Sequence, residues 1–294
     1  MAELSDKEIK QDEALACAPG VTPDVLTVDS VIKMVPALKN HRHFVERVLH
    51  SLMIDEVNAV HRRHCHATGV EFARLLVEEE FRFRLRVDNE DVLDRFPVDP
   101  FITVSNHPFG GMDGIILIHL VGKHRPDYQV MVNMFLNNIS AMRPVFIAVD
   151  PIKTDDPEKK AVTMQGIRRA IAHVRGGHPL GFFPAGAVSK VDRTLHISDR
   201  LWQPTITRLI MQLKVPVIPI YFHGHNSAFF NILGLIDWRL RSARLPRELF
   251  KMRNSEVHVS IGEPISVAEQ SAYTDPDALG RFLRERTYAL ASLP

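Results

Sequence analysis

Residues 101–117 read FITVSNHPFGGMDGIIL, and this segment alone predicts a strand, a tight loop and a helix in succession. The apolar strand ends at Ser105, His107 follows it in the loop, and Asp113 stands six residues later, before an apolar helix. In open α/β sheets, ligands bind where strands end and helices begin. The loop glycines allow the chain to turn back, so that the Asp113 carboxylate reaches the His107 imidazole. A histidine oriented by a carboxylate is a general base.

The same pair also has a structural interpretation. An isolated histidine and aspartate more often serve as a turn residue and a helix N-cap. Here, however, Asn106, His107, Gly110, Gly111 and Asp113 fall within eight residues. That density favours a functional loop with His107 and Asp113 as the catalytic pair.

Strands and helices alternate along the rest of the chain. Strands are predicted at 101–105, 129–133, 145–149, 180–183, 217–222 and 257–261, and helices at 114–122, 156–175 and 204–213. Phenylalanine and arginine alternate from residue 81, which predicts a further strand over 81–87 with its arginines facing outward. This order indicates the α/β class. The predicted fold is a mixed, largely parallel sheet with flanking helices.

The first 80 residues follow a different pattern. Apolar residues between 44 and 60 have helical spacing and predict one helix of about five turns, and a short helix is expected after Gly69. We therefore expect a helical N-terminal segment over residues 1–80, packed on a domain formed by residues 81–294.

Composition and charge exclude several classes of protein. Of the 294 residues, 45% are hydrophobic and 24% are charged, which is typical of a globular chain. The net charge of +1 excludes a polyelectrolyte partner for the whole chain, and no nucleic-acid motif is present. Cys17 and Cys65 are too few for a disulfide framework or a four-cysteine zinc site, and they do not indicate an oxidising compartment.

The sequence predicts a cytoplasmic protein that associates with a membrane surface. No apolar stretch approaches the roughly 20 residues that cross a bilayer. The acidic N-terminus lacks the basic start and apolar core of a signal peptide.

Two neighbouring segments are candidates for that surface contact. Six bases lie in the stretch 239–253 among apolar side chains, which suits anionic lipid headgroups or an acidic carrier protein, although a solvated helix face is an equal alternative. The apolar run 229–236 before it suits core packing somewhat better than an acyl-chain wall or a membrane-facing lip.

Two further segments carry polar residues after apolar strands. Residues 180–190, LGFFPAGAVSK, end in Ser189 and Lys190, which with Arg193 could hold an anionic group or be plain solvated residues of a turn. Residues 215–227 read VPVIPIYFHGHNS. A histidine and cysteine cluster at 61–66 lacks a clear set of zinc ligands and is better explained as a solvated helix end.

NHPFGGMDG, FPAG and VPVIPIYF, in this order, resemble the lysophospholipid/glycerophosphate acyltransferase family. The first motif is most similar to a hemolysin-like branch that includes ornithine-lipid and related lyso-aminolipid O-acyltransferases. The resemblance spans roughly residues 81–266. It implies transfer of a fatty acyl group from acyl carrier protein or coenzyme A to a lysolipid hydroxyl, at the cytoplasmic membrane surface. It implies no permanently bound cofactor, no metal and no covalent acyl-enzyme.

The resemblance also assigns residues. His107 matches the catalytic histidine and Asp113 its partner, with five residues between them where the family usually has four. Pro184 and Gly186 match the family's FPEGTR block, whereas Ala185 stands where that block has Glu. The substrate-binding residues implied are Asn106, Gly110, Gly111, Arg143, Pro184, Gly186, Ser189 and Lys190.

The departures from the family pattern bear on the acceptor. Val188 stands where the FPEGTR block has Arg. The family also has a phosphate-binding arginine after a Phe-Ile pair; this chain lacks it there, and Arg143 is the candidate to replace it. These changes favour a lyso-aminolipid over a simple phosphate acceptor. Backbone amides at Gly110, Gly111 or near Gly186 would bind the oxyanion. Two alternatives remain: a thioester hydrolase that uses the same pair on water, and a lipid- or carrier-binding protein without catalysis.

Overall fold

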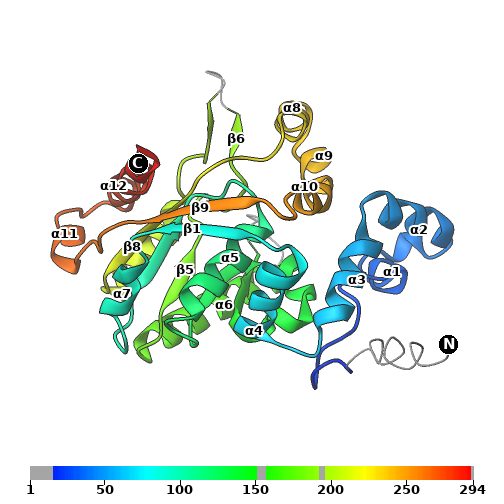
Figure 1. The fold of residues 1–294 in the computed structure, drawn as a ribbon, viewed down its shortest axis with the longest axis horizontal. Coiled ribbons are helices and arrows are strands. Elements are labelled where there is room, and N and C mark those ends of the chain that lie inside the picture. Colours follow the sequence, from blue (N-terminus) through cyan, green and yellow to red (C-terminus); the bar gives the residue numbers. More distant parts are fainter. Residues whose placement is uncertain (1–15, 151–156, 192–195, 293–294) are drawn as a thin grey trace, which may run out of the picture.

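The computed structural model describes residues 16–150, 157–191 and 196–292 (Figure 1). Its main sheet has seven strands in the order β1-β9-β8-β2-β5-β3-β4. Neighbouring strands are parallel except for β8 and β9, which pair antiparallel. The predicted α/β fold with a mixed, largely parallel sheet is confirmed. The strands are β1 (Arg84–Asp88), β2 (Ile102–Ser105), β3 (Gln129–Asn133), β4 (Phe146–Val149), β5 (Leu180–Phe182), β8 (Val217–Phe222) and β9 (Glu256–Ile261).

The strand directions place the 106–113 loop at one edge of the sheet. Strand β2 lies between β8 and β5 and is parallel to both. The carboxyl ends of all three strands therefore meet at this edge, and His107 follows β2 there. A separate antiparallel pair, β6 (Lys190–Val191) and β7 (Ile197–Ser198), lies in the segment after β5.

Helices cover both faces of the sheet. The helices are α1 (Val28–Met34), α2 (Arg42–Ser51), α3 (Ile54–His64), α4 (Gly69–Arg74), α5 (Gly111–Gly122), α6 (Pro157–Arg175), α7 (Pro204–Leu213), α8 (Ala228–Ile236), α9 (Trp238–Ala243), α10 (Leu245–Lys251), α11 (Val267–Ser271) and α12 (Pro276–Ala289). All of α5 except Gly111 is buried, as expected of a helix that is apolar on every side. Side chains of α4 and α5 pack in one core cluster, and those of α6, α7 and α12 pack in another.

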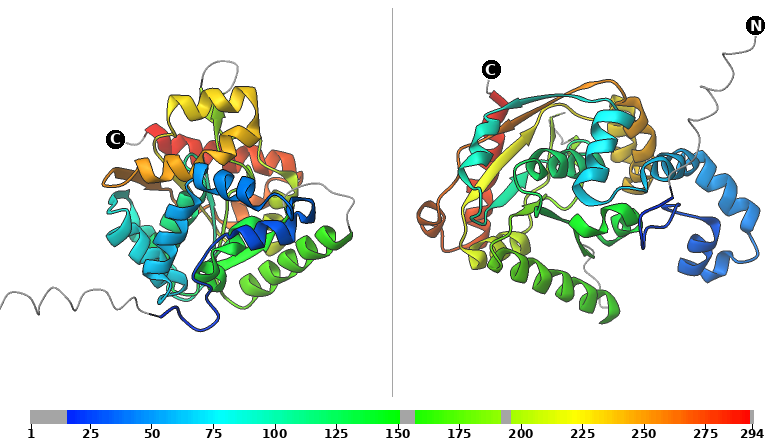
Figure 2. Two further views of the ribbon diagram at one scale, coloured as in Figure 1. Left: turned by 90° about the vertical axis from the view of Figure 1, so that its right-hand side faces the viewer. Right: turned by 60° about the horizontal axis from the view of Figure 1, so that its bottom comes forward.

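The N-terminal segment departs from its prediction in two places. The single helix expected over residues 44–60 is two helices, α2 and α3, because Met53 takes a left-handed φ of 60° between them. Strand β1 begins at Arg84 rather than at residue 81, since Arg82 also has a positive φ. The predicted outward arginines, Arg82, Arg84 and Arg86, are all exposed. Figure 2 shows α1–α3 at one end of the molecule.

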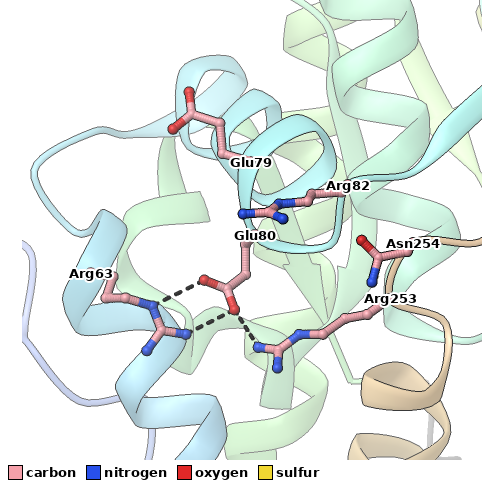
Figure 3. Close-up of a pocket in the computed structure, with 6 residues that line it drawn as sticks. All are labelled: Arg63, Glu79, Glu80, Arg82, Arg253 and Asn254. Carbon is pink, nitrogen blue, oxygen red and sulfur yellow. Dashed lines mark hydrogen bonds and ion pairs between the residues drawn. The ribbon is translucent and has the colours of Figure 1, made fainter.

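Ionic contacts to the buried carboxylate of Glu80 join α3 to the sheet domain (Figure 3). The Glu80 carboxylate accepts hydrogen bonds from Arg63 at 2.8 and 3.0 Å and also contacts Arg253. His64 Nε2 lies 3.2 Å from it. Burial opposes the charge of Glu80, but these partners outweigh burial and hold its pKa at about 2. Glu79 points away from the cluster in Figure 3.

The 61–66 segment is only partly the solvated helix end that the sequence suggested, because Arg62 and Arg63 are exposed but Cys65 is buried. His61 is buried, and its Nδ1 lies 3.0 Å from the Pro23 carbonyl oxygen. Burial lowers the pKa of His61. Cys65 forms a disulfide with Cys17, a pairing for which the two cysteines alone gave no signal. The segment therefore fastens residues 17–23 to the end of α3.

Candidate active site

The side chains of His107 and Asp113 meet in the loop between β2 and α5. Nδ1 of His107 lies 2.9 Å from Oδ2 of Asp113. Despite this short distance the two atoms do not form a full hydrogen bond, which is common in catalytic pairs before substrate binds. The Asp113 side chain is fully buried, whereas 17% of the His107 side chain is exposed. Because Nδ1 is enclosed, Nε2 is the ring nitrogen left to take a proton from a substrate.

The loop backbone fixes the Asp113 carboxylate. Oδ2 accepts the N–H of Phe109 at 2.9 Å and the N–H of Gly110 at 3.0 Å. Gly110 has a φ of +84°, and a Cβ there would lie 3.0 Å from a methyl group of Leu245, so the loop needs glycine at this position. Burial raises the pKa of Asp113, although the His107 contact and the two N–H groups oppose that shift.

Further contacts hold His107 itself. Its ring packs on Phe183 with centroids 4.4 Å apart. Its main-chain N–H donates to Oδ1 of Asp199 at 3.2 Å, and its carbonyl accepts the N–H of Ser189 at 2.8 Å. Asp199 could not be recognised as a site residue from the sequence, because a lone aspartate in HISDRLW belongs to none of the motifs quoted above.

An apolar cavity of about 690 Å³ opens beside the histidine. His107, Gly110, Gly111 and Gly186 line one part of it, so the structure brings these four predicted site residues together. The rest is largely apolar and extends to α6 and α7. Its lining includes Met131, Phe146, Met164, Ile167, Ile206 and Leu209. A largely apolar cleft with a few polar groups at one place suits a ligand with a hydrocarbon tail and a reactive end.

Other predicted binding residues make their contacts within the protein. Asn106 exchanges two hydrogen bonds with the main chain of Phe222, at 2.7 and 2.8 Å, and so ties β2 to β8. The Ser189 hydroxyl donates to Asp199 at 2.6 Å. The Pro184 carbonyl accepts the N–H of Gln203. None of these three predicted residues lines the cavity.

Arg143 and Lys190 also lie outside the cavity lining. Nε of Arg143 donates to the Asn137 carbonyl at 2.9 Å, and Lys190 is exposed in β6. Arg193 lies outside the described residues. Their roles in substrate binding stay predictions.

An arginine that the sequence analysis did not single out lies against the 183–186 turn. Arg200 donates from Nε to the Ala185 carbonyl at 2.7 Å and from Nη2 to the Gly186 carbonyl at 3.2 Å. The residue is exposed, and its Nη1 has no partner among the residues that the structure describes. A guanidinium group thus lies beside the turn in which Val188 replaces the arginine of the FPEGTR block.

The apolar run 229–236 is not core, contrary to the preferred interpretation of the sequence. Phe230 is buried, but Phe229, Ile232, Leu235 and Ile236 are each more than half exposed. These four side chains, with Trp238 and Leu240, form a surface on α8 and α9 that we call the apolar lip. The described part of the chain places no element over it. Figure 1 shows α8, α9 and α10 grouped together at the start of β9.

The basic stretch that follows carries less free charge than its composition suggests. Arg244 and Lys251 each contact Glu248 at 3.1 Å, and Arg253 contacts Glu80. Arg241 is buried and donates to the carbonyls of Val188 and Ser189 at 3.3 Å. Arg247 is exposed, while the side chain of Arg239 is outside what the structure describes. Most of these bases therefore hold the fold together.

Asp88, His223 and His258 form a second polar cluster, away from the cavity. Their potential metal-binding atoms lie within 4.8 Å of one another. Nε2 of His258 is 2.5 Å from Oδ2 of Asp88, and the two imidazole rings stack with centroids 3.8 Å apart. Parallel rings do not direct both ring nitrogens at one ion, because a metal binds in the plane of each imidazole. That the protein uses no metal stays a prediction.

Comparison with known proteins assigns the family. A family model described as "Acyltransferase" matches residues 31–293. The chain belongs to the acyltransferase family. This acyltransferase is 26% identical over 255 residues to a lyso-glycine lipid O-acyltransferase of Bacteroides thetaiotaomicron, covering 84% of this chain and 88% of the relative. It is 25% identical to the protein of the same name from Phocaeicola vulgatus, covering 85% and 88%.

A solved structure is also similar to the acyltransferase. The 1-acyl-sn-glycerophosphate acyltransferase PlsC of Thermotoga maritima matches with a TM-score of 0.48 and 15% sequence identity, covering 84% of this chain and 87% of that one. Within its described residues, the acyltransferase has no helix that is both long and apolar enough to span a membrane.

Proposed function

We propose that the enzyme transfers a fatty acyl group from a thioester of acyl carrier protein or coenzyme A to the hydroxyl of a lysolipid, with His107 as general base. The observation that carries this proposal is the 2.9 Å contact between His107 and Asp113 beside the apolar cavity. The acceptor is of the lyso-aminolipid type. The names of the two curated relatives support that class.

The proposed reaction needs one base and one oxyanion site. Nε2 of His107 takes the proton of the acceptor hydroxyl while that oxygen attacks the thioester carbonyl carbon. The Asp113 carboxylate stabilises the resulting imidazolium. When the tetrahedral intermediate collapses, the carbon–sulfur bond breaks and the thiolate takes the proton back from Nε2. The products are an ester and a free thiol, and the histidine returns to its neutral form.

The hydrogen bonds narrow the choice of oxyanion donor. The N–H of Gly110 donates to Asp113, and the N–H of Gly186 donates to the Phe183 carbonyl. Neither is free for a substrate oxygen. The N–H of Gly111 belongs to the first turn of α5, where helix N–H groups have no intrahelical acceptor. The proposal therefore gives Gly111 the oxyanion role.

The cavity is proposed to hold the acyl chain, and its size is expected to set the accepted chain length. Ile206 lines the cavity from α7 and is partly buried. Ile206→Trp is expected to lower kcat/KM for long-chain thioesters by roughly tenfold or more, because removing room for even one methylene costs 1–3 kcal/mol. Short-chain thioesters should keep their kcat/KM. Arg208→Trp, on the exposed side of the same helix, is the matched control. Equal losses for all chain lengths would contradict this role of the cavity.

Arg200 is proposed to bind the anionic headgroup of the acceptor. Arg200→Ala is expected to raise KM for a lysolipid with a carboxylate by about tenfold, since a charge-assisted hydrogen bond contributes about 1.5–3 kcal/mol. The KM for the thioester should not change. Because Arg200 also supports the 185–186 turn, the control is an acceptor whose carboxylate is esterified. A similar rise in KM for that neutral acceptor would show that Arg200 acts on the turn alone.

We propose that the enzyme meets its lipid acceptor at the cytoplasmic face of a membrane, through the apolar lip. Arg241 of α9 donates to the carbonyls of Val188 and Ser189, and Ser189 in turn binds the His107 carbonyl, so the helix that carries part of the lip adjoins the site. Exposed apolar side chains next to a lipid-handling cavity favour adsorption to a bilayer.

Replacing two residues of the lip tests this proposal. Ile232→Asp with Leu235→Asp is expected to weaken binding to anionic vesicles by about tenfold or more, while activity on water-soluble short-chain substrates persists. Val98→Asp changes an equally exposed apolar residue near the opposite edge of the sheet and is the control. Unchanged vesicle binding in the double variant would rule out the lip as the membrane contact.

A further inference from the structure

A second buried carboxylate lies beside the catalytic histidine. Asp199 directly follows β7, and its side chain is buried. Its Oδ1 accepts the N–H of His107 at 3.2 Å and the Ser189 hydroxyl at 2.6 Å. Trp202 Nε1 donates to Oδ2 at 3.4 Å. All these donors are neutral, and no cation among the residues that the structure describes is hydrogen-bonded to the carboxylate.

These contacts close a ring around the backbone of His107. Asp199 binds the N–H of His107, Ser189 binds its carbonyl at 2.8 Å, and the Ser189 hydroxyl binds Asp199. Both main-chain polar groups of the catalytic residue are thereby held by the same pair. The imidazole is held separately, by Asp113 and Phe183.

The position of Asp199 is itself fixed by the C-terminal helix. The N–H of Asp199 donates to the hydroxyl of Tyr288 at 2.7 Å, and its carbonyl accepts Nη2 of Arg284 at 3.0 Å. Both partners belong to α12. Among the described residues, the ionisable side chains near Asp199 include the guanidinium of Arg284 as well as His107, Tyr221 and Tyr288. Burial together with the Asp199 charge raises the pKa of both tyrosines.

A buried carboxylate is costly where neutral acceptors would satisfy the same donors. Burial raises the pKa of Asp199, which records that cost. A negative charge held beside an imidazole stabilises the imidazolium that forms when the histidine takes a proton. The costly group thus lies where its charge assists the proposed reaction.

We propose that Asp199 is a positioning residue for His107, which holds the histidine backbone in place and, through its charge, favours the protonated imidazole during transfer. The inference rests on the proposed general-base function of His107. It adds a second carboxylate to the pair formed with Asp113, and it gives Ser189 a supporting role in place of substrate contact.

Asp199→Asn tests the inference, because it keeps the shape and an acceptor oxygen while removing the charge. We expect kcat to fall roughly 10- to 100-fold, because the negative charge that stabilises the imidazolium is lost. KM for thioester and acceptor should stay within about twofold, since Asp199 does not line the cavity. In a plot of kcat/KM against pH, the acid limb, where activity falls as pH falls, should move to lower pH. Loss of a nearby negative charge makes the imidazole harder to protonate.

Asp127→Asn is the matched control, because Asp127 pairs with Arg125 near the start of β3, at the opposite edge of the sheet. It should lower stability and leave kcat and the acid limb unchanged. A folded Asp199→Asn enzyme with unchanged kcat and acid limb would overturn the inference. The inference would also be overturned if kcat fell equally in Asp199→Asn and Asp127→Asn and the acid limb did not shift.

If Asp199→Asn does not fold, a second variant tests the same inference. Ser189→Ala removes one hydrogen bond of the ring and keeps the Asp199 charge. It should lower kcat about 3- to 10-fold, the value of one modest hydrogen bond, without moving the acid limb. Unchanged kcat in a folded Ser189→Ala enzyme would then overturn the inference. Failure of the proposed function looks different, because wild-type enzyme would give no transfer from any thioester.

Discussion

Replacing His107 with alanine is expected to lower kcat by about 10³-fold or more, because a positioned general base contributes roughly 10²- to 10⁴-fold. The ring lies beside the cavity, and Asp113 contacts it at 2.9 Å. Among the described residues that line the cavity, His107 is the one histidine. The measurement is the single-turnover rate of ester formation from a saturating thioester and lysolipid, with product read by mass.

The His107→Ala enzyme should still fold and bind its substrates. The imidazole contributes a ring contact with Phe183 and part of the cavity wall, so its loss removes little of the core. His107→Gln, which fills more of the space, is the matched variant. Retention of more than about a tenth of the wild-type rate in both variants would exclude His107 as the base.

Replacing Asp113 with asparagine is expected to lower kcat roughly 10²- to 10³-fold. Two N–H groups, from Phe109 and Gly110, point at Oδ2, so they orient the amide with its oxygen in that position. That oxygen still faces Nδ1 of His107, so the tautomer with Nε2 free is kept. What is lost is the negative charge that stabilises the imidazolium. The fall in kcat is therefore expected to be smaller than for a substitution that also moves the imidazole proton of His107 from Nδ1 to Nε2.

The same substitution should not lower thermal stability. Burial raises the pKa of Asp113, so its ionisation favours the unfolded state as pH rises through that raised value. Asparagine removes this cost. The stability of Asp113→Asn relative to wild type should thus improve with rising pH, as measured by Tm between pH 5 and 8. A less active enzyme that is also much less stable at every pH would indicate that Asp113 acts only as a support for the loop.

The sheet could be predicted because its strands are short apolar segments bounded by turn residues. Strands β3 and β8 and helix α7 begin and end where their patterns predict. The order of strands in the sheet could not be predicted, since it depends on which apolar faces pack across long sequence separations. The break at Met53 was also missed, because a left-handed turn at a methionine has no compositional signal.

The site was predictable only where its chemistry lies within one motif. His107 and Asp113 share a loop, so spacing alone brought them together. Asp199 reaches His107 from 92 residues away, and Arg200 reaches the 185–186 turn through main-chain carbonyls. Such contacts depend on tertiary packing. The apolar lip was missed for the opposite reason, because an apolar helix has the same composition whether it is covered or exposed.

The most direct measurement of the central claim is acyl transfer by the purified enzyme. Thioesters of acyl carrier protein and of coenzyme A would be offered separately with a panel of lysolipids, including lyso-glycine, lyso-ornithine and lysophosphatidic acid acceptors. Products would be identified by mass for wild type and His107→Ala. We expect wild-type enzyme to form an ester on the hydroxyl of a lyso-aminolipid, and we expect His107→Ala to form none. Free fatty acid released without any acceptor, or an ester formed equally by both enzymes, would contradict it.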